Sequence, residues 1–274
     1  MRLAVAITFF YAHSRLKYLR RICEAHKNLG VEYTTFVITN AKDSNEIGLI
    51  RESVCHKDLC IVTPSYLGHP YLLTWSHRDI FREQISRGSG YSHFLYTEDD
   101  LLLTRQNLDY WLQAREVTRP TRFIPAFLRY EINSKGEIVS TDVTETQSLA
   151  SQLLRVGETA FVNLRQPYQG MYLMDKELAI EFLFSAASSP DTGIWGIREK
   201  AAQGLTYWNV PNGAHSRMIV GLDQRMRIHS HAQIHHLPNN YANNPDTHFG
   251  KLPVDDILTN PQHETKRASP EWRF

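Results

Sequence analysis

The chain has 274 residues, long enough for one large domain or two small ones with a substantial core. Hydrophobic residues make up 42% and charged residues 22%, as in folded globular proteins. The 30 basic and 29 acidic residues leave a net charge of +1. This balance argues against a dedicated nucleic-acid-binding protein, because such proteins concentrate positive charge.

The cysteines and the N-terminus indicate a cytoplasmic protein. The chain has three cysteines, Cys23, Cys55 and Cys60, which is an odd number without the spacing of a zinc site. We therefore expect reduced thiols. The apolar run 3–10 reaches about half of the roughly 20 residues that a membrane span needs. We therefore interpret it as a buried first strand, although peripheral attachment to a membrane is left open.

The first hundred residues alternate between strand and helix patterns. Apolar runs of strand length alternate with amphipathic stretches that end at glycine, which predicts βαβ units and a mostly parallel sheet flanked by helices. Such sheets bind ligands beyond the carboxyl ends of their strands. The predicted strands are 3–10, 31–39, 58–66 and 92–104, and the predicted helices are 14–30 and 72–88.

The second half is less regular. Residues 122–132 and 137–143 flank the turn Ser134-Lys135-Gly136 and predict an antiparallel hairpin. Farther along, two strand-like runs flank a turn at 167–170, and an apolar-faced helix follows them.

The most informative segment is Tyr96-Thr97-Glu98-Asp99-Asp100, at the end of an apolar run. Three adjacent carboxylates repel one another and are costly near a strand end unless they are solvated or bound to a cation. Mg²⁺ or Mn²⁺ meets this demand, because these ions prefer oxygen ligands and usually take one or two carboxylates. An acidic turn at the start of the next helix is the equally weighted alternative.

This segment carries a resemblance to a known family. FLYTEDDLLLTRQNLDYW (94–111) resembles the Glu-Asp-Asp segment of the N-acetylglucosaminyltransferase I family. The first strand and Ser14-Arg15 are similar to that family's nucleotide-binding start, and the order of elements resembles the GT-A fold of glycosyltransferases.

The resemblance implies a domain plan. The fold would be α/β and GT-A-like, a Rossmann-like sheet with a smaller antiparallel hairpin on the acceptor side. We expect one domain over 1–250, with a nucleotide-binding half at 1–105 and an acceptor half at 106–250. The polar segment 251–274 would be a tail or a lid.

The resemblance also implies roles for single residues. Asp100 would ligate Mn²⁺ or Mg²⁺ and so bridge to the donor's diphosphate. Thr8, Phe10 and Asn40 would lie beside the base, and Arg15 near the base or the diphosphate. For these four, ordinary strand-end or helix-surface positions remain the alternative. The complete set expected to bind the nucleotide sugar is Thr8, Phe10, Arg15, Asn40, Glu98 and Asp99.

Histidines form a second candidate cluster in MRIHSHAQIHHLPNNYA. Neutral imidazole binds Mn²⁺ or Zn²⁺, and many GT-A enzymes place a histidine after the core fold as a metal ligand. The segment at His235 and His236 resembles this feature, so either residue is a candidate for the metal or the diphosphate. His229 and His231 are weaker candidates, because alternate histidines on a strand are often merely half-buried.

A general base is the remaining requirement if the reaction inverts the sugar's configuration. In the similar family an acid lies beside a Trp, whereas here Gly196 and Ile197 follow Trp195. Glu199 and Asp191 are therefore displaced candidates, and a retaining mechanism without such a base is the alternative.

These residues predict a metal-assisted glycosyltransferase. We expect it to move a sugar from a UDP-sugar to a glycan, a lipid-linked or a protein acceptor. A nucleotidyltransferase is an alternative, although such enzymes favour a glycine-rich phosphate loop and residues 11–19 contain no glycine. A non-catalytic protein that binds nucleotides or carbohydrates is the other alternative.

Overall fold

A computed structural model describes residues 1–65, 68–191, 193 and 195–259. The chain divides into two compact units. The first contains Met1–Leu108 and Tyr168–Trp208, and the second contains Asp109–Pro167 and the segment that begins at Asn209. The first unit thus combines two segments that are far apart in the sequence.

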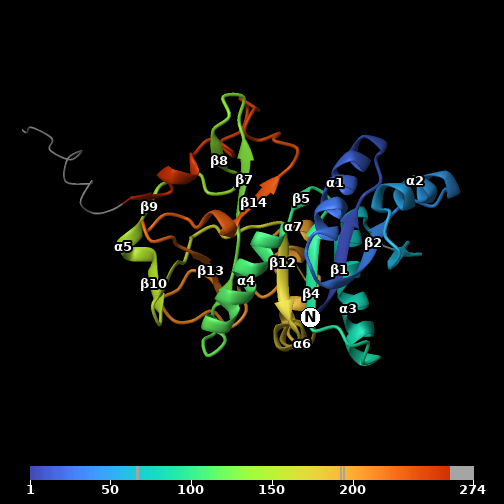
Figure 1. Ribbon diagram of the computed structural model, residues 1–274, viewed down its shortest axis with the longest axis horizontal. Helices are drawn as coiled ribbons and strands as arrows, with labels where there is room; N and C mark the ends of the chain where they lie inside the picture. Colours follow the sequence, from blue (N-terminus) through green and yellow to red (C-terminus); the bar gives the residue numbers. More distant parts are fainter. Residues whose placement is uncertain (66–67, 192, 194, 260–274) are drawn as a thin grey trace, which may run out of the picture. The chain divides into compact units, whose positions relative to one another are not determined.

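A five-stranded sheet forms the centre of the first unit (Figure 1). Four of its strands are parallel, and the fifth pairs antiparallel with its neighbour. This confirms the predicted mostly parallel α/β sheet. In order across the sheet, the strands are β12 (Met171–Asp175), β4 (His93–Glu98), β1 (Arg2–Phe9), β2 (Glu32–Thr39) and β3 (Leu59–Val62).

The helices of the first unit follow from amphipathic sequence. Helix α1 (Leu16–Lys27) buries one apolar face, and α3 (Ser76–Ser86) and α6 (Lys176–Leu183) pack against the sheet. Helix α2 (Ser44–Val54) is absent from the predicted elements, because only three of its eleven residues are buried and its apolar pattern is weak. The shorter elements are η1 (His13–Arg15), η2 (Pro70–Trp75), β5 (Leu101–Leu102), η3 (Ala186–Ser188) and α7 (Ile197–Ala201).

The strand order fixes where a ligand can enter this sheet. From β1 the chain proceeds to β2 and β3 on one side and then returns to β4 on the other side of β1. In open α/β sheets, the crevice at such a reversal, beyond the carboxyl ends of the strands, is where ligands bind. In this unit the reversal of strand order falls between β1 and β4.

The second unit consists mainly of short strands. Strand β7 (Leu128–Ile132) pairs antiparallel with β8 (Ile138–Ser140), which confirms the predicted hairpin, and β14 (Gln233–His236) runs parallel to β7. A second sheet has the order β10 (Leu153–Val156), β11 (Thr159–Val162), β13 (Met218–Gly221) and β6 (Ile124–Pro125). The remaining elements are α5 (Leu149–Gln152), η4 (Ser230–Ala232), η5 (Val254–Asp256) and α4 (Arg105–Thr118), which leads into this unit.

The polar segment that begins at residue 251 is folded over its described residues, 251–259. Strand β15 (Leu258–Thr259) pairs parallel with β9 (Gln147–Ser148). The backbone N–H of Ser140 also donates to the carbonyl of Leu252. The rest of the segment expected to be a tail or lid, 260–274, lies outside the described residues.

Among the helices that the structure describes, none has the length and apolar character needed to cross a membrane.

A buried histidine links α3 to the sheet. The ring of His77 contacts the carbonyl of Thr74 through Nδ1 and the hydroxyl of Tyr172 through Nε2. It packs against Tyr96 and Phe182, and its side chain is fully buried. Burial lowers the pKa of His77 to about 3, so the folded protein holds this ring neutral.

We expect His77 to make the protein less stable in acid. Below about pH 6.5 the unfolded chain takes up a proton that the folded chain refuses, so stability falls as the pH falls. Between about pH 7 and pH 5 the expected loss is about 2 kcal/mol. Urea unfolding at both pH values checks this, with His77→Gln as the comparison. An equal pH dependence in the variant would contradict the assignment.

Candidate functional site

The acidic turn after β4 lies at the reversal of strand order and is paired with an arginine. Asp99 and Asp100 are both buried, and Arg15 lies in the short η1 helix that follows β1. Arg15 donates through Nε and Nη2 to the two oxygens of Asp99, at 2.9 and 2.6 Å. Its Nη2 also lies 2.7 Å from Oδ2 of Asp100. The loops after β1 and β4 are thus joined at the point where the strand order reverses.

The electrostatics of this group depend on burial. Burial raises the pKa of Asp99 well above its usual range, the hydrogen bonds from Arg15 oppose this shift, and the charge of Asp100 reinforces it. Burial alone would lower the pKa of Arg15, but the two aspartates raise it further above its usual value. Arg15 is therefore a permanent cation that offsets part of the repulsion between the acids.

The acidic turn offers oxygen donors to a divalent cation. Its carboxylate oxygens are the donors that Mg²⁺ and Mn²⁺ prefer. Arg15 contacts both oxygens of Asp99 and, on Asp100, the oxygen Oδ2. Within the described part of the chain, no cluster of three or more His, Cys, Asp or Glu side chains is arranged to hold a metal. The donors therefore fit a cation that takes one or two carboxylates and completes its shell with phosphate and water.

Glu98 lies at the end of β4 beside a second arginine, which the sequence analysis missed. The hydroxyl of Tyr168 lies 3.4 Å from Oε1 of Glu98. Burial alone would lower the pKa of Arg198, but interactions with Glu98, Tyr168 and Glu199 together outweigh this effect and the net shift is upward. The indole Nε1 of Trp75 donates to the carbonyl of Ile197 at 2.9 Å, which anchors the start of α7. An arginine on a short helix, 100 residues away in the chain, carries no motif that would have revealed it.

The residues expected beside the base lie at the same edge of the sheet. Thr8 is buried and stands opposite Glu98 in the register of β1 and β4. The side chain of Phe10, just beyond β1, is 52% exposed and leaves an aromatic face accessible. Asn40 follows β2, and its Oδ1 accepts from the backbone N–H of Tyr11 at 2.7 Å. The structure thus brings these three predicted residues to the carboxyl ends of adjacent strands.

The two candidate bases differ in their surroundings. Glu199 lies in α7 and is 42% exposed, and its Oε1 is 3.3 Å from Nη2 of Arg198. Since Arg198 also interacts with Glu98, Glu199 belongs to the same group of charges. Asp191 is exposed in a loop, where it accepts a long 3.4 Å hydrogen bond from the backbone of Gly193. The contacts therefore favour Glu199 as the candidate.

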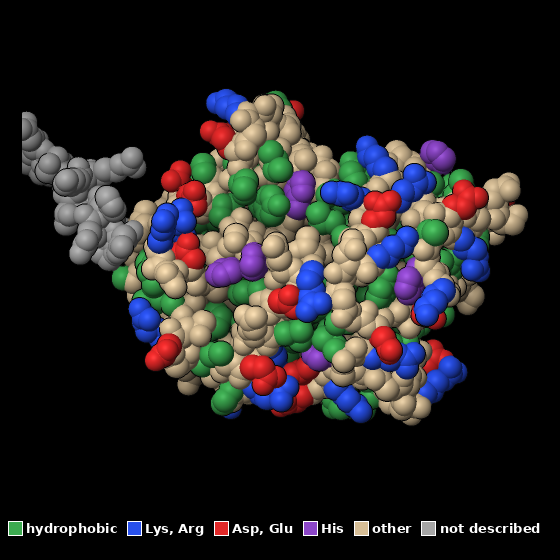
Figure 2. Space-filling model, viewed as in Figure 1, with side chains coloured by type: hydrophobic (Ala, Val, Ile, Leu, Met, Phe, Trp, Pro, Cys, Tyr) green, Lys and Arg blue, Asp and Glu red, His purple; other side chains and the backbone are tan. Residues whose placement is uncertain are grey.

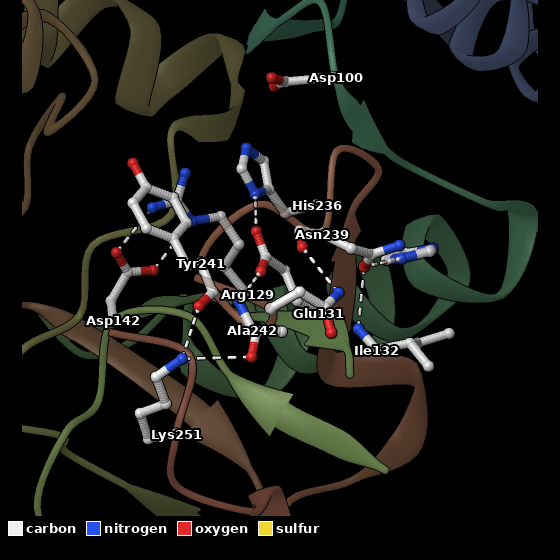
Figure 3. Close-up of polar contacts among 12 residues, drawn as sticks. Asp100, Arg129, Glu131, Ile132, Asp142, His236, Asn239, Tyr241, Ala242 and Lys251 are labelled. Atoms are coloured by element: carbon white, nitrogen blue, oxygen red, sulfur yellow. Dashed lines mark hydrogen bonds and ion pairs between the residues drawn. The ribbon is translucent and has the colours of Figure 1, made fainter. Parts of the chain in front are cut away.

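The predicted histidine pair lies in the second unit, at the end of β14. Nδ1 of His236 is 2.5 Å from Oε1 of Glu131, which is fully buried (Figure 3). His235 instead stacks on Tyr130, and its Nε2 contacts Asn239. Glu131 was missed because an acid in a strand sequence gives no sign of whether its side chain is buried. The expectation that a histidine shares a metal with Asp100 joins residues of different units and stays a prediction.

The weaker pair, His229 and His231, has local contacts. Nδ1 of His229 accepts from the backbone N–H of His231 at 3.1 Å, which caps the short η4 helix. The His229 ring also stacks on Tyr110. These contacts give His229 a structural role in capping η4 and packing against Tyr110.

Charged side chains of both signs are interspersed over the face of the molecule shown in Figure 2. This agrees with the net charge of +1.

Comparison with known proteins finds structural similarity at low sequence identity. Neither a protein-family model nor a curated protein matches this chain. Among solved structures, the chain is similar to residues 1–349 of S. aureus TarS, with a TM-score of 0.41 and 11% identity over 74% of this chain and 56% of that one. A second structure, S. aureus TarS 1–349 in complex with UDP-GlcNAc, gives a TM-score of 0.39 and 10% identity over 66% of this chain and 47% of that one. The chain thus spans about half the length of the TarS chains that it matches.

Proposed function

We propose that this protein is a glycosyltransferase that takes a sugar from a UDP-sugar and transfers it to a hydroxyl group. The observation that carries the proposal is the position of Asp99 and Asp100 at the reversal of strand order between β1 and β4. The resemblance of residues 94–111 to the Glu-Asp-Asp segment of a glycosyltransferase family supports the same assignment.

The nucleotide would lie along the carboxyl edge of the sheet. Phe10 offers an exposed ring for stacking on a base, while Thr8 and Asn40 supply polar groups beside it. Arg15 fixes the carboxylate of Asp99 by a two-point contact, and this arrangement is more directional than a single ion pair. The carboxylate of Asp99 is therefore held in a fixed orientation before the donor binds.

Asp100 would hold the cation that accompanies the donor's diphosphate. When bound, Mg²⁺ or Mn²⁺ supplies positive charge that stabilises the leaving diphosphate. Arg15 and Arg198 add positive charge at the same end of the sheet. Glu199 would accept the proton of the acceptor hydroxyl as that oxygen attacks the anomeric carbon.

Binding of UDP is expected to depend on both the cation and Asp100. Calorimetry with Mn²⁺ should give a clear affinity that falls by at least about 10-fold, or 1.4 kcal/mol, with EDTA and in Asp100→Asn. Asp79→Asn is the matched control, because Asp79 is an exposed carboxylate that also pairs with an arginine. Equal affinity in all four cases would exclude the metal role, and binding without turnover would favour a non-catalytic binding protein.

A further inference from the structure

Trp195 and Tyr207 form an aromatic pair on the surface of the first unit. Their rings are stacked, with centroids 5.3 Å apart and an interplanar angle of 15°. Trp195 is 39% exposed and Tyr207 is 38% exposed, so part of each ring is accessible to a ligand. Among the exposed large hydrophobic side chains that the structure describes, these two are the ones that stack on each other. Covering the accessible part of the pair with an apolar face of a ligand would be favourable.

The backbone on both sides of α7 holds the pair in place. Trp195 precedes the helix, whose start is anchored by the hydrogen bond from the indole of Trp75 to the carbonyl of Ile197. Tyr207 follows the helix directly after a buried run, residues 201–206. Because both segments are fixed to the core, a ligand that packs on the rings has less conformational freedom to remove.

The candidate base lies next to the pair. A Cβ atom at position 196 would clash with Oε2 of Glu199 and lie 3.0 Å from its Cδ. The carboxylate therefore occupies the space that a side chain at Gly196 would fill. Gly196 directly follows Trp195, and adjacent Cα atoms are about 3.8 Å apart. The glycine thus allows the carboxylate of Glu199 to lie against the backbone beside Trp195.

The side chains around the pair fit a carbohydrate. A pyranose has a face of C–H groups, which packs on the electron-rich face of an aromatic ring, and a rim of hydroxyl groups, which need hydrogen-bond partners. The side chains of Arg198 and Glu199 supply charged partners and are 50% and 42% exposed. Flat aromatic surface and accessible polar groups are therefore present together.

Other acceptors fit this surface less well. A lipid chain would place hydrocarbon against Arg198 and Glu199, and charged groups that lose water in this way cost free energy. An extended peptide commonly docks through main-chain hydrogen bonds to the edge of a sheet, whereas the pair lies in the segments that flank a short helix.

We propose that Trp195 and Tyr207 bind a pyranose ring of the acceptor, so that the protein transfers its sugar to a carbohydrate hydroxyl. This inference rests on the proposed function and narrows its acceptor to a saccharide. In the transfer, the acceptor oxygen forms a bond to the anomeric carbon of the donor sugar. The bond from that carbon to the diphosphate breaks, its electron pair leaves with UDP, and the acceptor proton goes to Glu199.

The first test is the binding of a saccharide, with and without UDP and Mn²⁺. An array of oligosaccharides that end in glucose, galactose, mannose or N-acetylglucosamine identifies a probe, and calorimetry gives its affinity. Trp195→Ala should weaken this binding by at least about 10-fold, or 1.4 kcal/mol. Trp195→Phe should weaken it by less than about threefold, because a phenyl ring keeps a face for stacking. Equal affinity in the unmodified protein and in Trp195→Ala would overturn the proposal.

Control variants separate the pair from general effects on the surface. Phe184→Ala removes an aromatic side chain that is 82% exposed in the same unit, and it should leave saccharide affinity unchanged. Tyr207→Ala should weaken saccharide binding, and UDP affinity should stay unchanged in all of these variants. Urea unfolding checks the fold, and Tyr207→Ala decides if Trp195→Ala does not fold.

Kinetics distinguish binding by the pair from catalysis by Glu199. Trp195→Ala should raise KM for the probe saccharide by about 10-fold with kcat nearly unchanged, because the ring contacts the acceptor equally in the ground state and the transition state. Glu199→Gln should instead lower kcat. A loss confined to kcat in Trp195→Ala would overturn the assignment.

Failure of the inference differs from failure of the proposed function. UDP binding without binding of any saccharide on the array overturns the inference and leaves the proposed function in place. Transfer to a serine peptide or to dodecanol, with the saccharides inactive, overturns it as well. Saccharide binding that depends on Trp195, in a protein that binds no UDP, contradicts the proposed function and the acceptor role with it.

Discussion

Replacing Glu199 with glutamine is expected to slow sugar transfer by about 100-fold to 10,000-fold, while UDP binding stays nearly unchanged. The amide cannot accept the proton of the attacking hydroxyl, but it preserves the shape of α7. Glu199 also interacts with Arg198, which is itself coupled to Glu98 at the end of β4. The measurement is UDP release at saturating donor, with calorimetry of UDP as the check on binding.

Asp191→Asn provides the comparison for Glu199. Asp191 is exposed, and we expect its replacement to change turnover by less than about threefold, or 0.7 kcal/mol. NMR of the product gives the anomeric configuration. Near-normal turnover in Glu199→Gln would remove the assignment, and a retained configuration would remove the need for a base.

Loss of the Arg15 side chain is expected to destabilise the protein by about 2 to 3 kcal/mol. Breaking a fully buried ion pair typically costs about 3 to 5 kcal/mol. The cost is smaller for Arg15→Ala because the arginine side chain is 35% exposed and partly screened by water. Asp99 can also reduce the cost by taking up a proton, since burial already raises its pKa. The free energy of unfolding should be measured with urea at about pH 8, where Asp99 takes up a proton less readily.

Added cation should distinguish the electrostatic role of Arg15 from simple packing. In Arg15→Ala the two aspartates lose their positive partner, so Mn²⁺ should raise the melting temperature more than it does in the unmodified protein. Arg15→Lys should fall between the two, because a lysine keeps the charge but cannot form the two-point contact. Unfolding free energies equal within about 0.5 kcal/mol would show that the ion pairs contribute little.

The sequence predicted the elements of the first sheet that have strong local patterns. The continuous apolar runs of β1 and β4 and the amphipathic face of α1 are visible in any short window. Strand β12 was predicted as a strand, but not as the antiparallel neighbour of β4. That pairing joins residues more than 70 positions apart, and local periodicity contains no information about it.

The same limit applies to the candidate site. Glu98, Asp99 and Asp100 stood out because three adjacent acids are unusual at the end of an apolar strand. Sequence reasoning considered a metal ion as their positive partner, and the structure adds Arg15 as a second one. Glu131 was not predicted, because its contact with His236 joins residues more than 100 positions apart.

The most direct test of the account is a crystal structure of the protein with UDP and Mn²⁺. We expect the base beside Thr8, Phe10 and Asn40, and the diphosphate with its cation at Asp100, at the reversal of strand order between β1 and β4. UDP bound at another surface, or a cation bound away from Asp100, would contradict the proposed donor site.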